Sequence, residues 1–194
     1  MKTSLIKFIF PCLLFISTVN LAQSLNVGLR FEPYFYSQKE IPENKTQLKF
    51  IPYPYSFYIK GAIIFSEKYE LELKTGMMFS EELFGLDYIV LFKYGITKTL
   101  FPFITYMLHE NSGASHQGWG IYNRNMDFIG FGAEAKITEI FSLDLVYYAP
   151  VGKTDLKYEF NYFTNSGAAT YSPITISQMG PMVKLGFIFN VFRF

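Results

Sequence analysis

The chain has 194 residues, of which 50% are hydrophobic, 20% aromatic and 17% charged, and its formal net charge is +1. This length predicts one domain, and the 22 Phe and 15 Tyr residues exclude a disordered chain. Because there is no basic excess to neutralise phosphates, we expect no nucleic-acid partner. The single Cys excludes a disulfide framework and a cysteine-based zinc site.

The N-terminal segment has the pattern of a secretory signal peptide. Lys2 and Lys7 accompany an apolar stretch at 8–19, and the small residue Ala22 follows it. The stretch has about 12 residues, whereas a membrane-spanning helix needs roughly 20. We therefore expect residues 1–22 to be a cleaved signal peptide and residues 23–194 to form the exported domain.

The remaining chain alternates between apolar and polar residues, which is the side-chain period of a β-strand. In the first run, at 25–32, every odd position is apolar and every even position is polar or Gly. With the weaker runs included, the pattern predicts about eight strands, near residues 25–32, 53–65, 69–79, 87–95, 100–109, 129–137, 141–151 and 184–191.

The connections between these strands alternate in length. Those near 66–68, 96–99 and 138–140 are short, whereas 37–52, 110–126 and 152–174 are long and rich in Asn, Gly, Ser and Pro. Short turns on one side and long loops on the other are typical of a transmembrane β-barrel. Strands of roughly 9–11 residues also fit a tilted membrane crossing.

Charged residues on the polar face of the strands are balanced in sign. A soluble sheet carries mixed charges on its solvated face, whereas a narrow membrane barrel must pair them inside, because an unpaired buried charge is costly. A narrow membrane barrel therefore requires balanced charges, whereas a soluble sheet only permits them. The predicted lumen charge network comprises Arg30, Lys60, Lys74, Lys93, Lys136 and Lys184 with Glu32, Glu70, Glu72, Asp87, Glu134 and Asp144.

Aromatic residues cluster near the strand ends, where the girdles of a membrane barrel lie, for example at 34–36 and 53–57. The chain ends in a strand-like run at 185–194 that closes on Phe192-Arg193-Phe194. Counting back from Phe194 by twos reaches the polar Asn190, whereas the other alternate positions are apolar but place Arg193 outward. A bulge near Asn190 would reconcile the two patterns; otherwise the last residues lie in the periplasm.

With these features the exported chain resembles the small eight-stranded outer-membrane β-barrels of Gram-negative bacteria, the OmpA/OmpX-like architecture. The resemblance implies an all-β, antiparallel, up-and-down transmembrane barrel in the bacterial outer membrane, in contact with its lipid. It also implies that Phe192 and Phe194 belong to a C-terminal assembly signal read by the barrel-insertion machinery. It names a fold and a location rather than an activity.

The interior of such a barrel is just wide enough for side chains. We expect a non-enzymatic barrel with a closed, charge-paired lumen and no cofactor or metal, acting through its long loops on an unknown partner. One alternative is a lipid acyl hydrolase that uses His109, Glu110 and Ser112, although their spacing matches no hydrolase motif. The other is a secreted lipocalin-like barrel, which would hold a small ligand and carry its charges outside.

Overall fold

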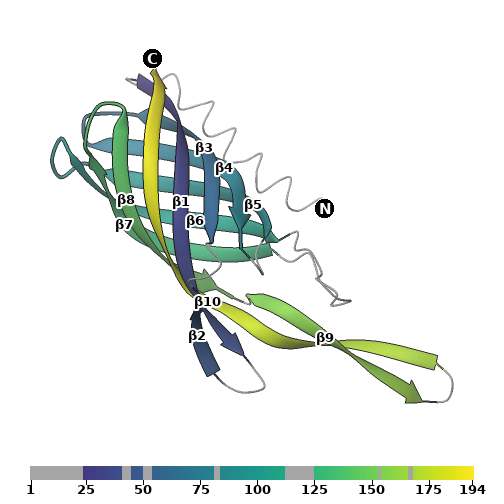
Figure 1. Ribbon diagram of the computed structural model, residues 1–194. Coiled ribbons are helices and arrows are strands. Elements are labelled where there is room, and N and C mark those ends of the chain that lie inside the picture. Colours follow the sequence, from purple (N-terminus) through teal and green to yellow (C-terminus); the bar gives the residue numbers. More distant parts are fainter. Residues whose placement is uncertain are drawn as a thin grey trace.

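The described residues of the computed structural model form ten β-strands (Figure 1). It describes residues 24–40, 45–49, 54–80, 84–111, 125–152, 154–165 and 168–194. Most strands have 10–12 residues, whereas the first and last are longer. They are β1 (Ser24–Glu40), β2 (Lys45–Lys49), β3 (Tyr55–Ile64), β4 (Tyr69–Phe79), β5 (Phe84–Tyr94), β6 (Leu100–Asn111), β7 (Asn125–Lys136), β8 (Phe141–Val151), β9 (Asp155–Asn165) and β10 (Ala168–Arg193).

Eight of these strands close into an antiparallel barrel. The hydrogen-bonded order runs β1-β3-β4-β5-β6-β7-β8-β10, and β10 pairs back onto β1. Residues Leu25 and Phe194 exchange main-chain hydrogen bonds at the seam, which extends the closure to the end of the chain. The predicted eight-stranded up-and-down barrel is therefore confirmed, with β2 and β9 outside the ring.

The predicted signal peptide at residues 1–22 lies outside the described residues, so it stays a prediction. In the described part of the chain, no helix is both long and apolar enough to cross a membrane.

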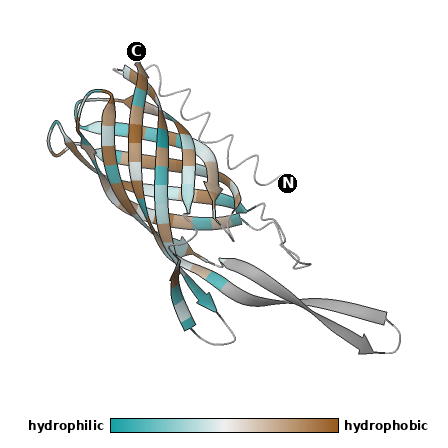
Figure 2. Ribbon diagram, viewed as in Figure 1, coloured by the Kyte–Doolittle hydropathy of each residue, from teal (hydrophilic) through white to brown (hydrophobic). Residues whose placement is uncertain are grey.

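Side chains alternate between the inside and the outside along most of the barrel strands. In β8, Asp144 and Val146 are buried, whereas Leu145 between them is 57% exposed. Figure 2 shows the same alternation of hydrophilic and hydrophobic residues along the barrel strands. The charges face inward, which is opposite to the arrangement that the lipocalin-like alternative requires. Large apolar residues face outward instead, including Leu29, Phe57, Ile59, Ile104, Phe131, Leu145 and Phe189.

Aromatic side chains line part of the outside of the barrel near the loop end, the end at which β1 and β10 run on into protruding ribbons. Phe31, Tyr55, Phe79 and Phe84 lie on four successive strands, with ring centroids 6.3, 5.2 and 5.5 Å apart. Aromatic residues in this position form the girdles of a membrane barrel. The expectation that 34–36 belongs to a girdle was wrong for its tyrosines, since both point into the lumen.

Three short turns form the opposite end of the barrel, the turn end, as predicted. They lie at 65–68, 95–99 and 137–140. In two of them a threonine side chain completes the turn: Thr97 Oγ1 accepts a hydrogen bond from Leu100 N, and Thr138 Oγ1 accepts one from Phe141 N, both at 3.0 Å. A hydroxyl that binds the main chain in this way stabilises a tight connection.

At the loop end two segments predicted as loops are in part β-ribbons. The segment 37–52 contains the end of β1 paired with β2, and 152–174 contains β9 paired with the first half of β10. The strand β10 pairs with β8 only as far as Met182, and at Gly180-Pro181 its register with β1 shifts. A bulge tolerates a proline, which has no N–H to donate to the ladder. The third predicted loop, 110–126, lies outside the described residues except at its ends.

A second register shift, near the C-terminus, explains why the polar Asn190 falls among the alternate positions counted back from Phe194. Val27 pairs with Phe192 and Gly28 with Asn190, which leaves Val191 as the extra residue of a bulge. The predicted bulge near Asn190 is therefore present. Because the bulge reverses the alternation, the side chains of Phe192 and Phe194 are 59% and 75% exposed on the outside.

Candidate functional site

The most unusual feature of the barrel is the set of charges inside it. Eleven of the twelve residues predicted for the lumen charge network are buried, each with an exposed fraction of 3% or less. The exception is Lys136, whose side chain is 28% exposed at the turn end. The strand alternation explains this placement, because each of these residues has the inward parity of its strand.

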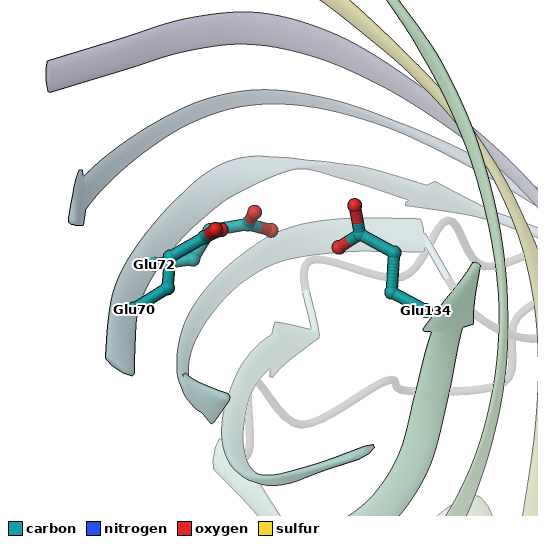
Figure 3. Close-up of side chains that lie close together, drawn as sticks. All are labelled: Glu70, Glu72 and Glu134. Atoms are coloured by element: carbon teal, nitrogen blue, oxygen red, sulfur yellow. The ribbon is translucent and has the colours of Figure 1, made fainter. Parts of the chain in front are cut away.

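The Lys93 ammonium, on β5, is the centre of the part nearest the turn end. It lies 2.7 Å from Glu70 Oε1, 2.7 Å from Glu72 Oε2 and 2.5 Å from Glu134 Oε2. The three carboxylates come from β4 and β7 and point toward one another (Figure 3). One oxygen from each carboxylate lies within 4.8 Å of the others, a spacing that suits a metal ion. The Lys93 ammonium already supplies the positive charge that these carboxylates need.

The Arg30 guanidinium, on β1, forms the middle of the network. It donates to Glu72 at 2.6 Å and pairs with Glu32 at 2.9 Å, and it also contacts Asp144. Gly186 makes room for this arrangement, because a Cβ there would collide with Asp144 Oδ1 and lie 3.0 Å from Arg30 Nη2. Glu72 also binds Lys93, so that the two parts form one continuous network.

Asp87 is the central residue of the part of the network nearest the loop end. Its Oδ1 lies 2.6 Å from His109 Nδ1, and its Oδ2 accepts a hydrogen bond from the Tyr58 hydroxyl. The Lys184 ammonium donates to Tyr58 at 2.5 Å and lies 3.4 Å from Asp87 Oδ2. These four side chains come from β3, β5, β6 and β10, and all are buried. They therefore tie together strands on different sides of the barrel.

Apolar side chains fill the rest of the lumen. The buried cluster combines aromatic rings with the thioethers of five methionines, three of them on β6, β7 and β4. Unbranched, polarizable methionines suit such an irregular space. The cluster consists of Tyr34, Tyr36, Tyr58, Met78, Ile89, Leu91, Phe103, Met107, Met126, Phe128, Val146, Tyr148, Met179 and Met182.

The structure separates two residues of the hydrolase alternative, His109 and Glu110. His109 and Glu110 are consecutive in β6, so that His109 points into the lumen while Glu110 points outward. Asp87, not Glu110, is the carboxylate that contacts the imidazole. Ser112 lies outside the described residues.

The sequence did not predict that His109, Tyr58 and the methionines near the loop end face the lumen. The predicted strand at 100–109 includes His109, but the residue was weighed only as part of a hydrolase cluster with Glu110 and Ser112, and in the structure β6 runs on to Asn111. Extending the parity of Phe103 and Met107 along β6 would have placed His109 inside the barrel, because the period of the strand is two.

A search of protein-family models finds no match to the chain, and a search of curated protein sequences finds none either. Among solved structures, the chain is similar to the N-terminal β-barrel domain of OprF from Pseudomonas aeruginosa, with 13% identity, 86% of this chain and 100% of that chain covered, and a TM-score of 0.43.

The chain is also similar to the outer-membrane protein OprG from Pseudomonas aeruginosa (12% identity, 88% and 97% covered, TM-score 0.43). The attachment invasion locus protein Ail of Yersinia pestis gives 12% identity, 88% and 98% coverage and a TM-score of 0.37. At these identities and TM-scores we assign the class from the barrel itself. Its ring of eight strands, apolar exterior and charged interior make this chain a small eight-stranded transmembrane β-barrel.

Proposed function

We propose that the chain is a non-enzymatic integral protein of the bacterial outer membrane, with a closed lumen, that acts as a structural, surface or partner-binding protein. One observation carries this proposal: charges that a soluble barrel would expose are buried in pairs, while large apolar side chains lie outside. This arrangement is favourable only where hydrocarbon surrounds the barrel.

The outer membrane is the bilayer that the sequence favours. Export through a signal peptide at residues 1–22 would deliver the chain across the inner membrane. The exposed Phe192, on the seam strand β10, and Phe194, directly after it, are in the position of an assembly signal for the barrel-insertion machinery. The lipid of that membrane is the partner that the apolar exterior requires.

The absence of enzymatic activity is supported by the surroundings of His109. The imidazole and the Asp87 carboxylate are both 0% exposed, so that a lipid substrate has no route to them through the described residues. General acid–base catalysis requires the base to lie within hydrogen-bond reach of the substrate. This pair therefore serves the structure of the lumen rather than a reaction at the rim.

A partner surface is supported by the ribbons beyond the loop end. In the described sheet, β9 pairs with β10 on one side only, which leaves its other edge free of a ladder. An exposed strand edge is a template on which another chain can add a strand. We place the partner-binding surface on the ribbon formed by β9 and the first half of β10.

Membrane fractionation tests this proposal. The full chain is expressed in a Gram-negative host, and its outer membranes are extracted with carbonate and run unboiled and boiled on a denaturing gel. We expect the protein to stay with the outer membrane and to migrate differently after boiling, since a barrel resists detergent until heated. Recovery of the protein in the soluble fraction, or identical migration in both lanes, would contradict the proposal.

A further inference from the structure

The buried imidazole of His109 leaves one nitrogen without a partner. Its Nδ1 lies 2.6 Å from Asp87 Oδ1, and its Nε2 is buried with no hydrogen-bond partner among the described residues. Asp87 also accepts from Tyr58 and lies beside Lys184, as an ionised carboxylate does. An ionised carboxylate only accepts, so Nδ1 donates to it, and Nε2 is the ring nitrogen that remains available to a ligand.

The direction of Nε2 follows from the order of the strands. His109 pairs with Asp87 of β5 on one side and with Met126 of β7 on the other. Since Nδ1 faces Asp87, Nε2 points away from β5, toward the side of Met126. Directly paired residues on one face have Cβ atoms about 4.5–5.5 Å apart, and both side chains are 0% exposed in the lumen.

A second thioether lies on the same face. Met107 precedes His109 by two residues in β6, is 0% exposed, and shares a buried cluster with Met126. Met78 belongs to that cluster too, but its sulfur lies 3.5 Å from the Lys184 ammonium, which would repel a cation there. In the strand register His109 therefore has two inward thioethers as neighbours, Met126 directly paired with it and Met107 two residues away in β6.

We propose that His109 Nε2 and the sulfurs of Met107 and Met126 form a binding site for a soft monovalent cation, Cu(I). Thioether and imidazole ligands select Cu(I) over hard cations such as Mg²⁺ or Ca²⁺. A carboxylate that accepts from the other ring nitrogen is the usual support of a metal-binding histidine, and Asp87 has that position.

Packing alone does not explain this arrangement. Methionines that merely fill the lumen account for the buried sulfurs. They do not account for a buried ring nitrogen with no partner, which carries the full cost of its lost hydration. A bound cation satisfies that nitrogen and uses the sulfurs beside it. This site goes beyond the structural and partner-binding role proposed above and does not depend on the ribbons.

Titration with Ag(I), a redox-inert probe for Cu(I) sites, tests the proposal. The full chain carries Cys12→Ser, so that its single thiol does not bind the probe, and is refolded in detergent with methyl-¹³C methionine. We expect one equivalent of Ag(I) to shift the methyl resonances of Met107 and Met126 in a saturable manner, while that of Met77, on the outer face, stays in place. The absence of a saturable shift at Met107 and Met126 would overturn the proposal.

Variants identify the ligands. His109→Gln keeps a donor for Asp87 but offers no imidazole, and Met126→Leu conserves volume; each should weaken Ag(I) binding at least about 10-fold. The matched control Met77→Leu should bind as tightly as the parent. Each variant is first checked for the mobility difference between unboiled and boiled samples. Unchanged affinity in a folded His109→Gln barrel would refute the site even if Ag(I) binds elsewhere.

Discussion

The Lys93→Met substitution removes the only ion-pair partner that the described residues offer Glu134. The Lys93 ammonium contacts three carboxylates at 2.5–2.7 Å. After its removal Glu72 keeps Arg30 and Lys60, at 2.6 and 3.2 Å, whereas Glu134 is left as a buried, uncompensated charge. Breaking a buried pair in this way costs about 3–5 kcal/mol of unfolding free energy.

A rim substitution provides the matched control. Lys136→Met removes the same functional group, but this side chain is 28% exposed and lies 3.4 Å from Glu70. Because water screens such a pair, its loss should cost only about 0–1 kcal/mol. The two variants therefore differ in the burial of the lost ammonium and not in its chemistry.

Urea unfolding of the barrel in lipid vesicles, followed by far-UV circular dichroism and unboiled gel mobility, measures both free energies. The double variant Lys93→Met/Glu134→Gln removes the stranded charge, so it should recover about 0.5–3 kcal/mol relative to the sum of the single variants. Equal stability of Lys93→Met and Lys136→Met, or additive effects in the double variant, would refute the inference that the lumen is a tightly paired network.

Three further predictions concern the two faces of the wall and the lumen. Leu145→Arg, on the outward face near the middle of β8, should cost about 2–4 kcal/mol, whereas Asp144→Asn leaves Arg30 its other two carboxylates and should cost less; equal urea midpoints for the two would contradict the assigned parity. Gly186→Ala should cost about 1–3 kcal/mol by overpacking, because a Cβ there collides with Asp144, and wild-type stability in the same assay would show that the lumen has room. The intact barrel should give no large stable conductance in planar bilayers, since side chains fill its lumen, and a reproducible open channel would contradict this.

The barrel was predictable from sequence because its strands alternate between outward apolar and inward polar residues. Alternation in β8 separates Leu143 and Leu145 from Ser142 and Asp144, and the structure buries only the second pair. The same alternation suggested the bulge near Asn190 as one of two ways to reconcile the apolar positions of the last strand, and the register shows that bulge. The positions of the charged residues in the lumen follow from the alternation as well.

The contacts inside the lumen were not predictable in this way. Parity places Asp87 inside but does not select His109 as its partner, because that choice depends on the register between β5 and β6. The ribbons were missed for a different reason. Residues 37–52 and 152–174 are polar enough to suggest loops, and their pairing comes from the continuation of β1 and β10 beyond the membrane wall.

The central claim is that one face of each barrel strand meets lipid and the other meets a sealed, charged lumen. Spin labels placed singly along β8 of the reconstituted barrel, at positions 143 to 147 in a Cys12→Ser background, test it most directly through their accessibility to oxygen in the bilayer. The account predicts high accessibility at positions 143, 145 and 147 and low accessibility at 144 and 146, following the burial pattern. Accessibility that does not alternate, or that shows water on both faces, would contradict it.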